Sequence, residues 1–378
     1  MAPERRHDLD ALRVLAVLVL LAYHASRPFD LEPWHVKSDA ASVVVQLLGG
    51  VFTPWRLPLL FMVSGAGTFF ALRRRTAGAY ARERLTRLGV PLVAGMLIVV
   101  PPQVYVERIS RWMPNRQSPR DFDGSFLAFY PHVFEGIYPH GNFSWHHLWF
   151  LVYLLVFSLV ALPLFRWLRA GGPARARLGP LLERPGVVWL PALGLAVLHV
   201  ALRGAFPPTN ALVGDWWNLA HYFLVFVLGY ALLTDETFCA AAVRRRHVAA
   251  ALFVALTALR IGLVVTLPPA APYSATYVLM LTLRGVLEWA ALLAVLGYAH
   301  RHLTRPSPLL RWGGDRVYPF YVWHQTVIVV LAYWVLRWWV PDGVQYLALL
   351  AGGFALTLLL CALVERTWLT RLLFGMRP

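Results

Sequence analysis

The sequence predicts an all-α polytopic membrane protein with about ten transmembrane helices and both termini in the cytoplasm. Three observations lead to this fold class. First, 58% of the 378 residues are hydrophobic and only 14% are charged, which is too little polar surface to coat soluble domains. Second, apolar runs of about 20 residues, long enough to cross about 30 Å of hydrocarbon, recur along the chain. Third, most basic residues fall in alternate connections between these runs.

Ten apolar runs divide the chain from end to end. We place them at residues 9–29, 42–72, 85–106, 147–168, 187–206, 217–233, 248–267, 277–299, 317–340 and 344–368. No small-x-small cleavage site follows the first run, so we expect it to remain in the mature protein. The second run is too long for one straight span, and we expect Pro54 and Pro58 to break or bend it.

The charge distribution orients the spans. The chain carries 35 basic and 19 acidic residues, for a net charge of +16. Arginines cluster at 73–87, 166–184 and 244–246, after spans two, four and six, which makes that side cytoplasmic. The positive charge therefore reflects topology and lipid headgroups, and we expect no nucleic-acid partner.

These features predict one membrane-embedded domain over residues 1–378, with no appended soluble domain. We expect it in a bacterial cytoplasmic (inner) membrane as a multi-pass protein. Residues 107–146 form the largest extracytoplasmic loop, which is the natural place to bind an outside substrate.

Composition gives no sign of redox or cofactor chemistry. Cys239 and Cys361 are the only cysteines and lie far apart, and Lys37 is the only lysine. The histidines of the outer loop, such as His146 and His147, have no cysteine partners and no i,i+4 spacing. We therefore expect no metal site and no permanently bound cofactor.

Span one carries the most informative ionisable residues. Arg13 and His24 are eleven residues apart, about three helical turns, so both project from one face with about 16 Å between them along the axis. This stripe suits a path that carries an anionic donor toward an outside acceptor. Alternatively, Arg13 reaches cytoplasmic headgroups, Asp10 pairs with it at i,i+3, and His24 lies at the interface.

Other polar residues within or beside spans are weaker candidates for a tunnel or acceptor site, because intramembrane ionisable groups are costly and usually functional. Arg284 and Glu288 are spaced i,i+4 near the middle of span eight, where a structural ion pair explains them equally well. His324 in span nine serves either a site or a helix-to-helix hydrogen bond. These candidates are Asp10, Glu107, Arg260, Arg284, Glu288, Tyr321 and His324. The small residues of 62–67 favour close helix packing over a nucleophile elbow.

Five blocks in order resemble the integral-membrane acyltransferase-3 family. LDALRVLAVLVLLAYH is similar to its first helix, with Arg13 and His24 at the family's Arg and His positions. LPLLFMVSGAGTFFALRRR resembles its second helix, and RERLTRLGVP its Arg-x-x-Arg entry to the third, here Arg84 and Arg87. HLWFLVYLL and VYPFYVWHQTVIVVLAYW resemble later helices. The ending LFGMRP resembles the branch that includes periplasmic-glucan succinyltransferases.

The resemblance implies O-acylation of an extracytoplasmic glycan from cytoplasmic acyl-CoA. The phosphates of coenzyme A cannot cross hydrocarbon, so Arg13, Arg84 and Arg87 are the expected donor-binding residues. For Arg84 and Arg87 the alternative is ordinary positive-inside charge. His24 then acts on the acceptor hydroxyl as a general base or becomes transiently acylated.

A transporter or flippase for a glycan or organic acid is the alternative function. It explains many spans and buried charges equally well, although no internal repeat is visible. The sequence does not reveal the acyl group, the acceptor or the oligomeric state.

Overall fold

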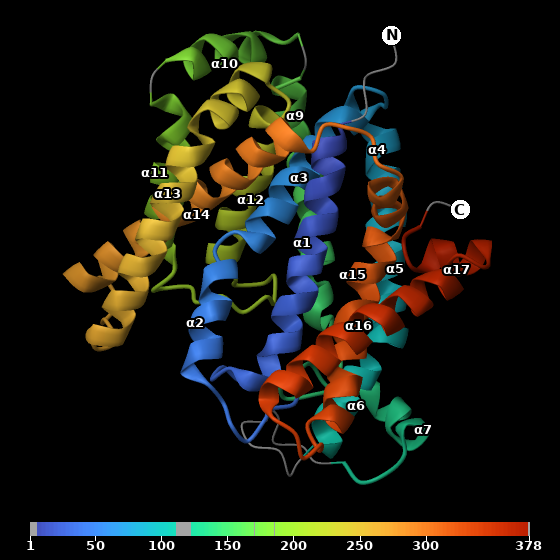
Figure 1. The fold of residues 1–378 in the computed structure, drawn as a ribbon. Helices are drawn as coiled ribbons and strands as arrows, with labels where there is room; N and C mark the ends of the chain where they lie inside the picture. The colour runs from blue at the N-terminus through green and yellow to red at the C-terminus, as the bar shows by residue number, and fades with distance from the viewer. Residues whose placement is uncertain (1–5, 111–121, 170, 185, 377–378) are drawn as a thin grey trace. The chain divides into compact units, whose positions relative to one another are not determined.

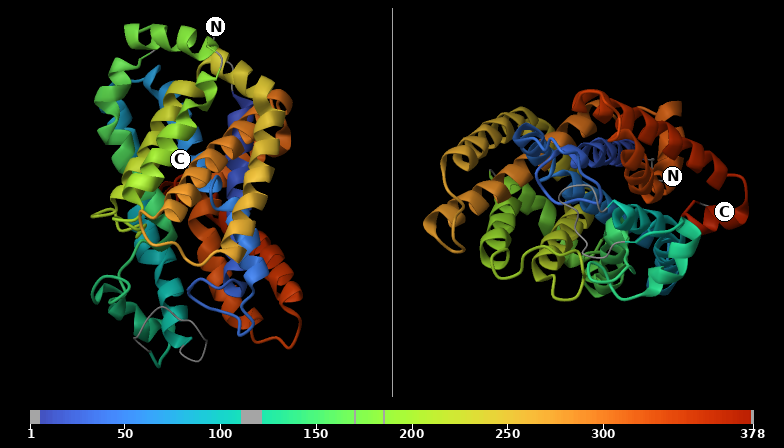
Figure 2. Two further views of the ribbon diagram at one scale, coloured as in Figure 1. Left: turned by 90° about the vertical axis from the view of Figure 1, so that its left-hand side faces the viewer. Right: turned by 90° about the horizontal axis from the view of Figure 1, so that it is seen from below.

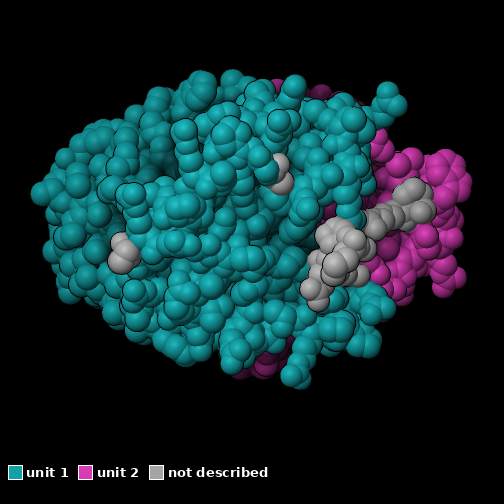
Figure 3. Space-filling model, turned by 90° about the horizontal axis from the view of Figure 1, so that it is seen from above, with its two compact units in different colours: residues 1–16, 53–84, 153–311 teal, residues 17–52, 85–152, 312–378 magenta. Residues whose placement is uncertain are grey.

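The computed structural model describes residues 6–110, 122–169, 171–184 and 186–376, and all of its regular secondary structure is helical within these ranges. The chain divides into two compact units, shown in Figure 3. Unit 1 comprises residues 1–16, 53–84 and 153–311, and unit 2 comprises residues 17–52, 85–152 and 312–378. Three helices, α1 (His7–Ser26), α8 (Trp149–Val160) and α15 (Pro308–Val335), contribute residues to both units.

Unit 1 is built from long helices that lie side by side. α13 runs along α14, α14 packs against α11, and α3 packs against α12 (Figures 1 and 2). Gly65 and Gly229 permit the α3–α12 approach, because a Cβ on either would collide with the backbone of the other helix. This confirms close packing at 62–67. The helices of this unit are α3 (Arg56–Leu72), α4 (Ala77–Arg84), α9 (Leu162–Trp167), α10 (Pro173–Glu183), η6 (Val187–Trp189), α11 (Leu190–Leu202), α12 (Trp216–Leu232), α13 (Glu236–Thr266) and α14 (Ala275–His302).

Unit 2 holds the second half of α1 together with shorter helices and most of α15. A Cβ on Gly353 of α16 would lie 3.3 Å from Ile328 of α15 and 3.6 Å from Leu21 of α1, so these three helices pack together there. Its other elements are η1 (Arg27–Phe29), α2 (Val43–Phe52), η2 (Leu85–Gly89), α5 (Val90–Ala94), η3 (Gly95–Val99), α6 (Pro101–Ile109), α7 (Phe126–Phe129), η4 (Tyr130–Phe134), η5 (His146–Leu148), α16 (Asp342–Val364) and α17 (Trp368–Leu373).

Among the described residues, six helices are long and apolar enough to cross a membrane, or seven if one bent pair counts as a span. The six are His7–Phe29, Val43–Leu72, Ala77–Ile109, Glu236–Thr266, Ala275–His302 and Asp342–Val364, and the bent pair is Pro173–Glu183 with Val187–Leu202. The apolar helices His146–Val160 and Trp216–Leu232 are shorter. Several apolar helices are therefore present, whereas the ten spans and the cytoplasmic termini remain predictions.

The long second run is interrupted where the sequence indicates. α2 ends at Phe52 and α3 begins at Arg56, with Pro54 between them and Pro58 in the first turn of α3. In the third run the segment Ala77–Ile109 contains two π-helical turns, η2 and η3. Such turns are rare and occur frequently at functional sites, and η2 contains Arg87.

The segment that follows α1 is held by a cluster of charged residues, which we call the Lys37 knot: the buried Arg27, Asp30 and Lys37 and the exposed Glu32. The Lys37 ammonium donates to the carbonyl oxygens of Arg27 and Asp30 at 2.7 and 2.5 Å and to Asp30 Oδ1 at 2.8 Å. Arg27 donates to Asp30 and Glu32 at 2.5 and 2.9 Å. Burial lowers the pKa of Lys37 although Asp30 bonds to it. The knot fixes the backbone on either side of Trp34 and His35.

The described part of the predicted extracytoplasmic loop, residues 122–146, is attached to the end of α6. Arg108 donates through Nε to Asn142 Oδ1 at 2.8 Å and through Nη2 to the carbonyl oxygen of Gly141 at 2.6 Å. Gly141 lies against the backbone of Glu135 and Gly136, so a Cβ there would collide with it. Residues 111–121 of the predicted extracytoplasmic loop lie outside the described part of the chain.

Candidate functional site

Two histidines from distant parts of the sequence meet in unit 2. His24 Nδ1 of α1 lies 2.9 Å from His324 Nε2 of α15, and the two rings stack with centroids 5.0 Å apart. His324 Nδ1 lies 2.6 Å from the carbonyl oxygen of Tyr321. Because a carbonyl only accepts, His324 Nδ1 carries a proton and its Nε2 accepts one from His24 Nδ1. The Nε2 atom of His24 therefore keeps its lone pair, as a base or a nucleophile requires.

The pair is supported by a third histidine. His147 Nε2 donates to the carbonyl oxygen of Val322 at 2.9 Å, and Tyr321 donates its hydroxyl proton to the carbonyl oxygen of His147. The rings of His147 and His324 meet edge to face at 5.5 Å. Both bonds join η5 to the turn of α15 that precedes His324, and they hold the His147 ring against that of His324.

A polar network continues from His147 to the loop after α1. Gln103 of α6 bonds His147 Nδ1 at 3.3 Å and the hydroxyl of Thr326 at 2.6 Å. Gln325 donates to Gln103 Oε1 at 3.0 Å and to His35 Nε2 at 3.3 Å. Buried amides of this kind need partners, and here α6 and α15 supply them to each other.

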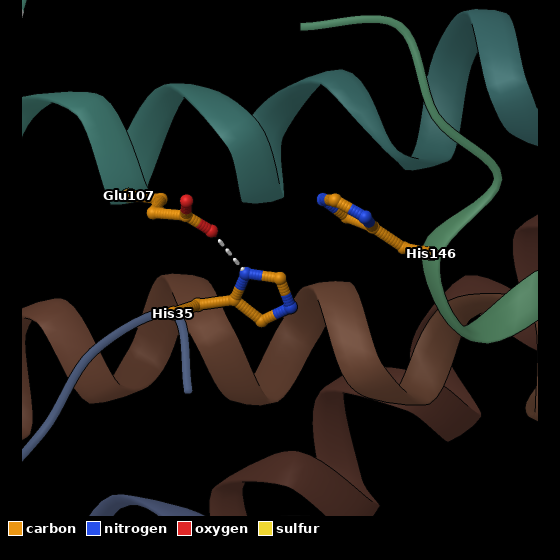
Figure 4. A group of neighbouring side chains, drawn as sticks. All are labelled: His35, Glu107 and His146. Carbon is orange, nitrogen blue, oxygen red and sulfur yellow. Dashed lines mark hydrogen bonds and ion pairs between the residues drawn. The ribbon is translucent and has the colours of Figure 1, made fainter. Parts of the chain in front are cut away.

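The network ends at three residues drawn in Figure 4. His35 and Glu107 are joined by a bond of 2.6 Å between Nδ1 and Oε2, and His146 lies beside them. Their ligand-type atoms all lie within 4.8 Å of one another. Glu107 is one of the predicted tunnel or acceptor-site residues, and the structure places it in the last turn of α6 and in this cluster.

The predicted residues of the donor side lie partly in unit 1. Arg13 pairs with Asp10 at 3.3 Å, the i,i+3 contact that the sequence indicates. A Cβ on Gly67 of α3 would lie 2.8 Å from Arg13 Nη2, so this glycine makes room for the guanidinium. Arg84 is the last residue of α4. Its Nε atom lies 3.2 Å from Glu83 Oε2, and its guanidinium lies over the ring of Tyr80. Arg87 follows in η2, where its carbonyl oxygen accepts a bond from Tyr318.

A second buried cluster lies in unit 1 and involves Glu288 of α14. Its two oxygens accept bonds from His199 Nε2 of α11 at 3.1 Å and from His221 Nε2 of α12 at 2.7 Å. The expected i,i+4 partner Arg284 therefore does not hold this carboxylate. A buried carboxylate is satisfied best by donors on both oxygens, and two facing helices provide them.

Two groups of side chains in the described ranges have the composition of a metal site: His35 with Glu107 and His146, and His199 with His221 and Glu288. The first is tied by a bond too short to admit an ion without rearrangement. In the second group, each oxygen of the carboxylate accepts a hydrogen bond from one histidine. The expectation of a protein without a metal stays a prediction.

Comparison with known proteins gives the family. The acyltransferase domain model of acyltransferase-3 matches residues 6–366, nearly the whole chain. The chain belongs to the acyltransferase-3 family. This confirms the resemblance read from the five sequence blocks and places both clusters within an acyltransferase-3 domain.

Curated relatives of this acyltransferase-3 protein carry the name "Glucans biosynthesis protein C". Those of Salmonella schwarzengrund, Salmonella typhi and Salmonella typhimurium are each 23% identical over 167 residues. The alignment covers 43% of this chain and 40% of each relative. The match therefore spans two fifths of the length of the relatives.

The structure also shows what sequence reasoning missed in this acyltransferase-3 chain. His35 is not among the predicted residues, although it follows the first span in the stretch Trp34 to Lys37, where three of four side chains are polar or aromatic. His199 and His221 each lie in an apolar run, and that placement was an available signal. His146 and His147 were considered only as metal ligands.

Proposed function

We propose that this protein transfers an acyl group from acyl-CoA to a hydroxyl of an extracytoplasmic glycan, with His24 as the reacting imidazole. The observation that carries the proposal is the bond from His24 Nδ1 to His324 Nε2 at 2.9 Å. It fixes the tautomer in which His24 Nε2 attacks or accepts a proton. His324 is a positioning residue in this scheme, comparable to the carboxylate that holds a catalytic histidine.

Arginines are proposed to hold the donor. Arg13, Arg84 and Arg87 are planar cations that bind phosphate through two parallel bonds, as coenzyme A requires. Arg13 and His24 belong to one continuous helix, α1, in which eleven residues correspond to about 16 Å. A donor whose phosphates lie near Arg13 therefore needs an extended arm to present its thioester to His24.

The relatives support a glucan as the acceptor, since their printed name refers to glucans. The arginine-rich connections support a cytoplasmic donor side, and residues 107–146 support an outer acceptor side. The protein would act in a bacterial inner membrane and hold no permanent cofactor. In sealed vesicles of known orientation, acyl-CoA should then be consumed only from the cytoplasmic face.

The decisive experiment uses purified protein in detergent. With labelled acetyl-CoA or succinyl-CoA and soluble glucan oligosaccharides, the wild type should acylate the glucan, and His24→Ala should abolish transfer without loss of folded protein. A transporter or flippase would perform no chemistry once the membrane barrier is gone. Robust transfer by well-folded His24→Ala would remove His24 from the reaction.

A further inference from the structure

Unit 2 contains a second oriented imidazole, the ring of His35, which is held by Glu107. A carboxylate only accepts, so His35 Nδ1 donates its proton to Glu107 Oε2 over 2.6 Å, and His35 Nε2 is left with a lone pair. Gln325 donates to that nitrogen over 3.3 Å, a long bond that a stronger donor can replace. Both side chains are buried.

The Glu107 carboxylate is itself held by donors. Arg108 Nη1 lies 3.2 Å from Oε1, and the Tyr138 hydroxyl lies 3.2 Å from Oε2. Burial and the Glu107 charge raise the pKa of the Tyr138 phenol, which therefore stays protonated and donates. A carboxylate held in place in this way keeps a bonded imidazole in one tautomer and stabilises the imidazolium that forms when it takes a proton.

The side chain of His146 independently indicates that a polar ligand can bind at this cluster. Its Nδ1 bonds the Ser144 hydroxyl at 2.9 Å, while its Nε2 is buried and has no hydrogen-bond partner among the described residues. Its backbone has φ +40°, an uncommon conformation for a residue with a side chain. Its ring lies 4.7 Å from that of His35.

A hydroxyl fits this cluster better than a metal ion. Zinc lies about 2.0–2.2 Å from each nitrogen or oxygen ligand in a tetrahedral arrangement, which separates those ligands by more than about 3 Å. The 2.6 Å between His35 and Glu107 is too short for this, and Arg108 adds a positive charge beside Glu107. A sugar hydroxyl, which both donates and accepts, would satisfy His35 Nε2 or His146 Nε2.

We propose that His35, oriented by Glu107, takes the proton of the acceptor hydroxyl, while His24 carries the acyl group. The inference rests on the proposed function. Trp34 stands near both imidazoles, with its ring 6.5 Å from that of His24 and 5.4 Å from that of His35. With His35 as the base for the acceptor hydroxyl, the role left to His24 is that of the acyl carrier.

The two half-reactions balance. In the first, His24 Nε2 bonds to the thioester carbon, the C–S bond breaks with its electron pair on sulfur, and the Nδ1 proton moves to His324 Nε2. In the second, the acceptor oxygen bonds to the acyl carbon as its proton moves to His35 Nε2. The C–N bond breaks, His324 returns its proton to His24, and the His35 proton leaves for the coenzyme thiolate through solvent.

The test separates the half-reactions in purified protein with acetyl-CoA or succinyl-CoA as donor and soluble glucan oligosaccharides as acceptor. Thiol release in one stoichiometric burst without acceptor reports the first half, and labelled glucan reports the second. His35→Gln and Glu107→Gln should keep the burst within about threefold. Both should lower kcat/KM for the glucan by about 10²-fold or more.

The chain offers a control in an exposed pair outside the proposed site, His247 and Tyr298, whose Nδ1 atom and hydroxyl oxygen lie 2.9 Å apart. His247→Gln and Tyr298→Phe should leave both readouts within twofold. Near-normal glucan transfer by His35→Gln, or equal loss of burst and transfer in a monodisperse variant, would overturn the inference. Wild-type transfer without a burst would overturn the acyl-carrier role of His24. A wild type with neither activity would instead refute the proposed function.

Discussion

Gly67 offers a way to disturb Arg13 without touching its charge. A Cβ at this position would lie 2.8 Å from Arg13 Nη2, whereas ordinary contacts begin near 3.4 Å. The guanidinium must therefore move by about 0.6 Å or more, and it can, because it ends a flexible side chain. Gly67→Ala should fold normally and shift only this cation.

The magnitude follows from the role proposed for Arg13. Loss of a hydrogen bond between charged groups costs about 1.5–3 kcal/mol, which corresponds to an increase of about 10- to 100-fold in the apparent KM for acyl-CoA. The KM for glucan should change by less than about twofold, because only the donor loses a contact. Initial rates over a matrix of both substrate concentrations provide the assay.

Alanine substitutions at two other glycines serve as controls for this experiment. Gly78→Ala adds a methyl group with nothing within 4 Å and should behave as wild type, while Gly65→Ala would collide with the backbone of Phe226 and should lower the yield of folded protein. If Gly67→Ala raised both KM values equally, or neither, Arg13 would have no special part in donor binding.

Variants at four other positions test the remaining assignments. His324→Ala should lower kcat by about 10²-fold or more at normal abundance, and His324→Gln, which can still accept from His24, should recover part of it; equal activity of both with wild type would exclude a positioning role. Replacing Arg87 by Ala should raise the KM for acyl-CoA more than that for glucan, and parallel changes would favour a topological role. Glu288→Gln should lower the midpoint of thermal unfolding by several degrees, since one histidine loses its acceptor at a cost of about 1–3 kcal/mol; an unchanged midpoint would show that the cluster adds no stability. Lys37→Met should expose residues 27–42 to limited proteolysis and reduce transfer, and unaltered digestion would show that the knot is dispensable.

The sequence was informative about spans and about residues within one helix. The eleven-residue interval from Arg13 to His24 falls in a single helix, and the pairing of Arg13 with Asp10 follows from i,i+3 spacing. The proline-containing break of the second span was likewise readable, because Pro cannot continue the hydrogen-bond ladder.

Contacts between helices could not be predicted from the sequence. His24 and His324 are 300 residues apart, and their meeting depends on how α1 and α15 are rotated. Glu288 shows the limit of local spacing, since its i,i+4 neighbour Arg284 competes with two histidines that approach from other helices. His35 could not be assigned because its partner Glu107 lies 72 residues further along the chain.

The Lys37 knot has a practical consequence for chemical labelling. The only lysine of the chain has a fully buried side chain, so amine-directed crosslinkers and fluorophores have no lysine target on the folded protein. Both cysteines are buried as well. One lysine introduced into a polar connection would thus become the sole reactive amine of that type. Its modification by an impermeant reagent in whole cells would report directly which face of the membrane that connection occupies.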